Sequence, residues 1–417
     1  MRFLGVDLCG PGLSLVEAGF EPSDPARTLQ VRRTNALTLP EPSEIPPWHW
    51  LSQALRLLPS RDFHNPERFA DEQLKPRLQA LAHQLADPLV ARQDPESQLV
   101  LVYPYRMPPI LHRYLPILFG QEPLKIRADH APGRPVGLEA PVALAIEATV
   151  RRACPLPADL LLLTGSGSTR ELTRAVITIE SATDSSPPRL RVQVLACFAL
   201  ETPEQIEAAR LADQIRGPDA SLIADAYASS DAADLLSALD LDAQQHLSVP
   251  ERAPADQTQA LTLGAVRYAG LRSEVGHQLL DALAESIEVQ HVSSNPLGVV
   301  GKNRQGEGIW YRLFPPLMTL PTSWAPVQSD EEGPKDRDKL LLAECLSPAH
   351  RHRQWLHQEH WEAAALSFHE WRRATKTSSM NPEPRAGLHA WSFQYRGREK
   401  DARSGQLHWT TQYAPPR

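Results

Sequence analysis

The stretch from Phe3 to Ala18 constrains this chain most, because two apolar runs flank a turn rich in glycine and proline. Such a pattern predicts a β-hairpin whose loop can approach a ligand closely. Asp7 closes the first run, so its carboxylate would stand at the loop entrance, where it can hold a hydrated divalent cation. A structural hairpin with an aspartate at its turn fits the same short motif, so the residues alone leave both interpretations open.

Later stretches extend the pattern. Leu160–Leu163 predicts a second apolar strand that enters a glycine- and serine-rich loop at residues 165–169, and Ala175–Glu180 predicts its return strand. Ala260–Ala269 predicts a buried helix that contains a glycine. Ser293–Val300 precedes a region of β character.

In this order and at these separations, the stretches resemble the heat-shock-70 (DnaK-like) chaperone family of the actin-like ATPase superfamily, as a divergent and truncated member. The resemblance covers residues 1–325. It implies an α/β fold, with an actin-like (ribonuclease H-like) two-lobe domain at residues 1–285 whose second lobe is reduced. A short β-rich, substrate-binding-like region would follow at residues 286–417, with a helical insert at about 347–375.

The resemblance also implies a nucleotide site. ATP and magnesium would be its cofactors, or it would have none if the site has fully decayed. Asp7 is the surviving catalytic candidate and would hold magnesium through water. The residues that the resemblance places beside the nucleotide are Gly10, Gly12, Gly165, Ser166, Gly167, Ser168, Thr169 and Gly264.

The chain departs from the family pattern at several polar positions. Aligning the second loop puts Leu163 where the family has an aspartate, and aligning the prolines puts Ala140 where it has a glutamate, with Glu139 one position off. Pro11 lacks a backbone N–H and so removes a phosphate donor from the first loop. The segment at residues 226–230 has no glycine, although close backbone approach to a purine needs one.

No catalytic lysine can be assigned, because Arg61, Arg68 and Lys75 are candidates without further support. Residues that act as a unit lose most of their activity when one is missing. The sequence therefore predicts ATP turnover near background.

Periodicity predicts further elements. Helices are expected at 70–89, 110–119, 137–150, 231–239 and 260–269, and strands at 98–103, 160–163, 175–179, 190–197 and 220–225. Two strands are expected within 290–325, a linker at 326–342, and an aromatic hairpin over the last forty residues.

The amino-acid composition limits the classes of partner and the cellular location that are expected. The net charge is −7, which gives no general attraction to nucleic acid or to an anionic membrane, and neither is expected as a partner. The four cysteines form no CxxC pair, and no apolar stretch is long enough to span a membrane, so a cytoplasmic location is expected. Other proteins, including unfolded or extended peptides, are the expected partners.

Three functions compete. The first is a non-catalytic, chaperone-like or scaffold protein that binds other proteins through its C-terminal region, which holds Trp355, Trp361, Trp371, Trp391 and Trp409. The second is an active ATP-dependent chaperone with an altered site. The third, a sugar kinase, is disfavoured because no Gly-Ala-Gly-Asp constellation with a catalytic aspartate is found.

Overall fold

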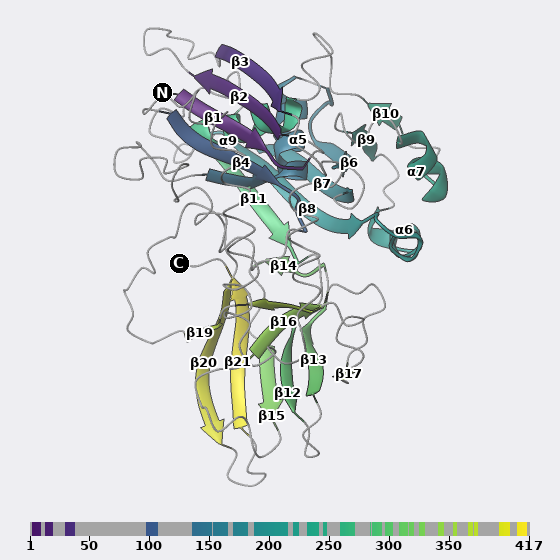
Figure 1. Cartoon of the computed structure of the whole chain (residues 1–417), viewed down its shortest axis with the longest axis vertical. Helices are drawn as coiled ribbons and strands as arrows, with labels where there is room; N and C mark the ends of the chain where they lie inside the picture. The colour runs from purple at the N-terminus through teal and green to yellow at the C-terminus, as the bar shows by residue number, and fades with distance from the viewer. Residues whose placement is uncertain are drawn as a thin grey trace.

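The computed structural model has a mixed α/β N-terminal part and a C-terminal part of strands (Figure 1). It describes residues 2–9, 13–19, 30–37, 97–106, 136–151, 153–165, 170–181, 187–215, 220–224, 232–241, 245–247, 259–271, 284, 286–293, 297–302, 308–315, 317–320, 325–329, 341–345, 353–356, 366–369, 371–373, 392–400 and 407–414. Within these residues, every helix is too short or too polar to cross a membrane.

The first sheet has the strand order β3-β2-β1-β4-β5. Strands β1, β2 and β3 form an antiparallel meander, whereas β4 and β5 run parallel to β1. The predicted hairpin of β1 and β2 is confirmed, with Asp7 opposite Ser14 at its end. The strands are β1 (Arg2–Asp7), β2 (Leu13–Gly19), β3 (Gln30–Leu37), β4 (Ser97–Tyr103) and β5 (Val136–Glu139).

The second sheet repeats this arrangement. Its strands β8-β7-β6-β9-β10 have the same order and the same directions as β3-β2-β1-β4-β5. Strand β11 adds parallel to β8, and β14 adds antiparallel to β11. The strands are β6 (Ala158–Thr164), β7 (Glu171–Glu180), β8 (Arg189–Ala199), β9 (Ser221–Ala224), β10 (Gln245–Leu247), β11 (Ser286–Val292) and β14 (Thr319–Leu320).

The two sheets share one topology, and each sheet with its helices is called a lobe below. The second sheet keeps all five strand positions of the first, and the expected reduction of the second lobe stays a prediction. The connection between β8 and β9 contains α6 (Pro203–Arg210) and the 3-10 turn η4 (Asp213–Ile215). Helix α7 (Ala232–Ala238) follows β9.

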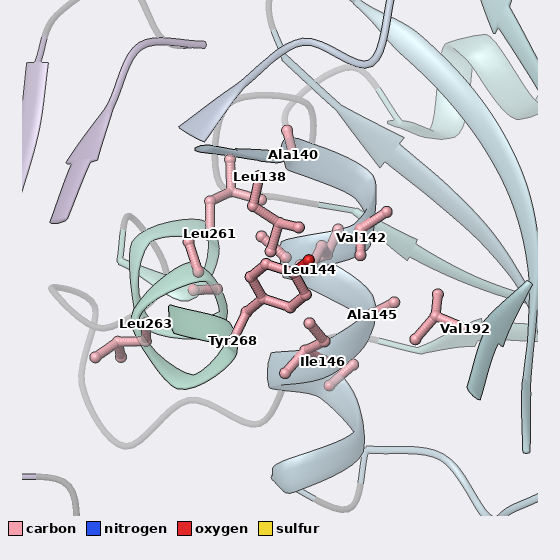
Figure 2. Packing of buried hydrophobic residues seen from close by; sticks show 14 of the residues in the cluster. Leu138, Ala140, Val142, Leu144, Ala145, Ile146, Val192, Leu261, Leu263 and Tyr268 are labelled. Atoms are coloured by element: carbon pink, nitrogen blue, oxygen red, sulfur yellow. The ribbon is translucent and has the colours of Figure 1, made fainter. Parts of the chain in front are cut away.

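Two buried helices join the lobes. Helix α5 (Ala140–Val150) packs on β6, β7 and β8 of the second sheet and also contacts β4 and β5 of the first. Helix α9 (Ala260–Leu271) packs on β1, β2, β4 and β5 of the first sheet and also contacts β11 of the second. The two helices also pack against each other, and Figure 2 shows Tyr268 of α9 between them, near Leu144 of α5. Every residue of α5 is buried, as expected for a helix that is apolar all round.

The C-terminal strands form two sheets, of orders β17-β13-β12-β16-β18 and β15-β21-β20-β19. The predicted aromatic hairpin is confirmed as β20 and β21. The strands are β12 (Leu297–Lys302), β13 (Gly308–Phe314), β15 (Ala325–Ser329), β16 (Leu341–Cys345), β17 (Arg353–Leu356), β18 (Leu366–His369), β19 (Trp371–Arg373), β20 (Ser392–Lys400) and β21 (Leu407–Ala414).

The helix expected at about 347–375 is wrong where that range is described, because β17, β18 and β19 lie there. Strand β18 pairs with β16, and β17 pairs with β13. Neighbouring strands therefore satisfy the backbone hydrogen bonds of a segment in which the spacing of apolar residues had predicted a helix. The linker expected at 326–342 likewise overlaps β15 and β16. The helices expected at 70–89 and 110–119 lie outside the described residues.

Candidate functional site

Three parallel strands of the first sheet end at one edge. β1 ends at Asp7, β4 at Tyr103 and β5 at Glu139, and the register places Tyr103 opposite Glu139. All three side chains are buried, Asp7 and Tyr103 completely. Ligands of open α/β sheets bind outside the carboxyl ends of parallel strands, so this edge is the candidate site.

Asp7 stands where the sequence predicted, at the exit of β1. Its Oδ1 accepts a hydrogen bond from the backbone N–H of Cys9 at 2.9 Å, which closes the start of the loop. Along β1, Asp7 shares a face with Gly5, and a Cβ at Gly5 would meet Cγ2 of Thr262 at 2.2 Å. Asp7 therefore lies on the face of β1 that α9 covers.

The equivalent position in the second lobe is the end of β6. Leu160 and Leu162 belong to the core around α5, whereas Leu163 belongs to a separate cluster that includes Leu222 and the α7 residues. Because strand residues alternate between faces, Thr164 takes the inward position that Asp7 has on β1. The sequence had placed Leu163 there, which is wrong, but the correction also supplies no carboxylate.

Glu139 is the site residue that the sequence dismissed. Ala140, which the aligned prolines matched to the family glutamate, is buried in the apolar core at 1% exposure. Glu139 precedes it as the N-cap of α5, is 5% exposed, and has its Oε1 3.6 Å from Nδ1 of His291 on β11. An acidic residue at the exact strand-to-helix boundary is the signal that could have found it.

Glu171 connects the two lobes. It is the first residue of β7, and its carboxylate accepts the backbone N–H of Tyr105 at 2.8 Å and that of Arg106 at 2.6 Å, both just beyond β4. Burial raises the pKa of Glu171 to about 7, with a smaller contribution from the charge of Glu139, while the two N–H donors and the Arg106 charge oppose the shift. The loop after β4 is thus bound directly to the second sheet.

Tyrosine side chains occupy the same junction. The hydroxyl of Tyr105 donates to the carbonyl of Val292 at 2.9 Å and accepts the N–H of Val292 at 2.8 Å, which joins the loop after β4 to β11. Burial, with Glu139 close by, raises the pKa of Tyr103 and of Tyr105 well above the ordinary tyrosine value. Both rings therefore remain neutral at physiological pH.

The glycines assigned to the nucleotide have different environments. A Cβ at Gly264 would lie 1.9 Å from the carbonyl oxygen of Ala143, so this glycine permits close contact between α9 and α5. Gly165 has φ 80°, a left-handed conformation that suits glycine, at the exit of β6. The other predicted contact residues, Gly10, Gly12, Ser166, Gly167, Ser168 and Thr169, lie outside the described residues, as do Arg61, Arg68 and Lys75.

The described residues do not fit a hydrolytic magnesium–ATP site. Within the described ranges, His, Cys, Asp and Glu side chains form no group of three or more that could hold a metal ion. The inward position at the end of β6 offers the hydroxyl of Thr164, which is a weaker magnesium ligand than a carboxylate. Phosphoryl transfer depends on positioned metal and charge, and the described ends of β1 and β6 supply one carboxylate between them, that of Asp7.

Comparisons with known proteins give no family. No protein-family model and no curated protein matches the chain. Among solved structures it is similar to the ethanolamine utilization protein EutJ from Carboxydothermus hydrogenoformans, with 11% identity, a TM-score of 0.29 and coverage of 64% of this chain and 89% of that one.

A second similar structure is the Ppx/GppA phosphatase of Aquifex aeolicus, in its type II variant, with 11% identity and a TM-score of 0.24 over 54% of this chain and 67% of that one. Both are distant structural likenesses. The fold of this chain is defined by the strand order and strand directions of its two N-terminal sheets.

Proposed function

We propose that this protein is a non-hydrolysing, heat-shock-70-like member of the actin-like ATPase superfamily that acts as a chaperone-like or scaffold module for other proteins. The first half of the proposal, the absence of ATP hydrolysis, rests on the residues at the end of β6. Thr164 takes the inward position there and Leu163 packs in an apolar cluster, so the described end of β6 offers no carboxylate. The buried carboxylate of the second lobe near this junction, Glu171, accepts the backbone N–H groups of Tyr105 and Arg106. The contacts of Glu171 and Tyr105 support it, because they connect the two lobes at this junction through the chain's own groups.

An ATP assay tests this half of the proposal. We expect turnover in the presence of magnesium at background, on the order of 10⁴-fold or more below an active enzyme, because a catalytic unit that lacks one member loses most of its activity. Calorimetry with magnesium and ATP measures binding separately. Magnesium-dependent turnover that Asp7→Ala abolishes would reject the proposal.

The alternative is an active ATP-dependent chaperone with an altered site. One observation favours it, since β5 keeps a buried carboxylate, Glu139, at its end although the sequence alignment had lost it. The same assay decides between the two functions.

The second half of the proposal places partner binding in the C-terminal strands. Aromatic residues recur along β20 and β21, and β19 and β15 flank this pair in a four-stranded sheet. A sheet edge accepts an extended peptide through backbone hydrogen bonds, with side-chain pockets giving specificity, and the edges of this sheet are β15 and β19, which pair with β21 and β20.

A truncation tests this surface. We expect that deleting residues 381–417 removes binding of a labelled, permanently unfolded protein in a fluorescence anisotropy assay, because it removes both β20 and β21. The control is an unchanged proteolysis pattern for the N-terminal lobes. Equal affinity of the truncated and full chains would place binding elsewhere.

A further inference from the structure

The chain returns to the second sheet after its first two C-terminal strands. Strands β12 and β13 form an antiparallel hairpin that follows β11 along the chain. The next strand, β14, then pairs antiparallel with the end of β11 through two residue pairs. Residues 317–320, which include β14 and are called the strap below, therefore attach the second end of the hairpin to the strand from which its first end departs.

Ser293, the residue that follows β11, binds the strap with all of its polar groups and is 4% exposed. Its backbone N–H donates to the carbonyl of Met318 at 2.8 Å, and its carbonyl accepts the N–H of Leu317 at 2.7 Å. Its hydroxyl accepts the N–H of Met318 at 3.1 Å and donates to the carbonyl of Pro315 at 3.3 Å. One residue therefore closes the base of the β12–β13 hairpin.

The strap is strained where Ser293 holds it. Leu317 has φ 62°, a left-handed conformation that costs free energy in a residue with a Cβ. Its side chain is partly buried and packs against the core between the two N-terminal sheets. Strained backbone persists only where the surrounding contacts over-determine it, so the bonds of Ser293 and this packing hold the strap against its own strain.

The end of β11 also has a support that does not involve the strap. Within the described residues, the pairing of β11 with β8 ends at Gln290. Two residues further, the hydroxyl of Tyr105 donates to the carbonyl of Val292 and accepts its N–H, which ties β11 to the first lobe. Opening of the strap therefore leaves β11 bound to both lobes.

We propose that the strap is a latch that opens without unfolding of the lobes, and that Ser293 is the residue that holds it closed. In the closed state, the base of the β12–β13 hairpin is fixed against β11. In the open state, Leu317 leaves the left-handed conformation, and the second end of the hairpin is no longer held. The latch goes beyond the proposed function, because it sets how firmly the C-terminal strands are attached with neither nucleotide nor partner bound.

Hydrogen exchange of the full-length protein tests whether the strap opens by itself. We expect the amides of Leu317 and Met318 to be at least about tenfold less protected than the paired amides of β7 and β8, because strain lowers the free energy of local opening. Equal protection of the strap and of β7 and β8 would show that the strap opens only when the lobe unfolds, and would overturn the latch. This measurement needs no variant.

Ser293→Ala tests the holding residue. The substitution removes the hydroxyl but keeps the backbone carbonyl that binds the N–H of Leu317, so the amide of Leu317 reports opening of the whole strap. We expect its protection to fall by about fivefold or more, the effect of losing one buried hydrogen bond, with β7 and β8 unchanged.

The matched control is Ser286→Ala, at the other end of β11, where the residue lies opposite Arg189 of β8 and outside the strap. It should change the protection of Leu317 by less than about twofold, because no hydrogen bond to the strap is removed. Protection of Leu317 that stays the same in folded Ser293→Ala would overturn the role of Ser293.

Discussion

Replacing Gly264 with alanine is expected to lower the free energy of unfolding by about 3 kcal/mol or more. The added Cβ would lie 1.9 Å from the carbonyl oxygen of Ala143 and 2.7 Å from its carbonyl carbon. These are backbone atoms of α5, so no side chain can rotate away, and α9 must separate from α5. Both helices belong to the core between the sheets, so the separation would loosen both lobes (Figure 2).

The sign of the stability change distinguishes a backbone clash from the effect of helix propensity. Helix propensity alone would make the substitution stabilising by about 1 kcal/mol, because alanine favours a helix interior over glycine. Chemical denaturation measures the change. The control Ala143→Gly, combined with Gly264→Ala, should not restore stability, since the clash is with the backbone of Ala143 and not with its side chain. A Gly264→Ala protein as stable as the parent would disprove the close contact.

Replacing Glu147 with alanine is expected to destabilise the protein by about 3–5 kcal/mol. Glu147 lies on α5 and is 1% exposed. Its Oε1 accepts a hydrogen bond from Nε of Arg151 at 2.7 Å, and its Oε2 accepts one from Nε of Arg267 at 2.9 Å. Glu147 therefore joins α5 to α9. Without it, two guanidinium groups that are only 15–16% exposed lose the acid that pairs with them.

Glu207→Ala is the matched control for this prediction. Glu207 pairs with Arg210 at 2.7 Å within α6, but its side chain is 51% exposed, so solvent screens the pair and its loss should leave the stability nearly unchanged. Thermal and chemical unfolding of the two variants provide the measurement. Equal losses in both variants would show that burial does not govern the contribution of Glu147.

Local patterns predicted much of the first lobe and the start of the second. Apolar runs on either side of a glycine-rich turn determine the β1–β2 hairpin and the strand β6, because such runs bury one or both faces of a strand. Helices were also predicted where α5, α7 and α9 lie, and for α5 the proline in the first turn supported the prediction. Strand β3 was missed, because its sequence is largely polar.

The site was only partly readable in this way. Asp7 could be placed, since a carboxylate that ends an apolar strand lies at the strand exit. Glu139 was not chosen as a site residue, because aligning the prolines matched Ala140 to the family glutamate and left Glu139 one position off. Such an alignment does not show which of the two side chains lies at the junction. The alignment of the second loop placed Leu163 at the position of the family aspartate, because face alternation along β6 becomes decisive only when the two apolar clusters on either side are known.

By itself the sequence determined the local elements of the lobes and the position of Asp7 at the exit of β1. Only the tertiary structure decided how distant residues combine. It showed that the lobes share one strand order, that strands replace the C-terminal helix, and that Glu171 holds the end of β4. The physical reason is that sheet pairing, helix contact and buried carboxylates depend on groups far apart in the chain, whereas spacing along the chain reports only each residue's own face and turn.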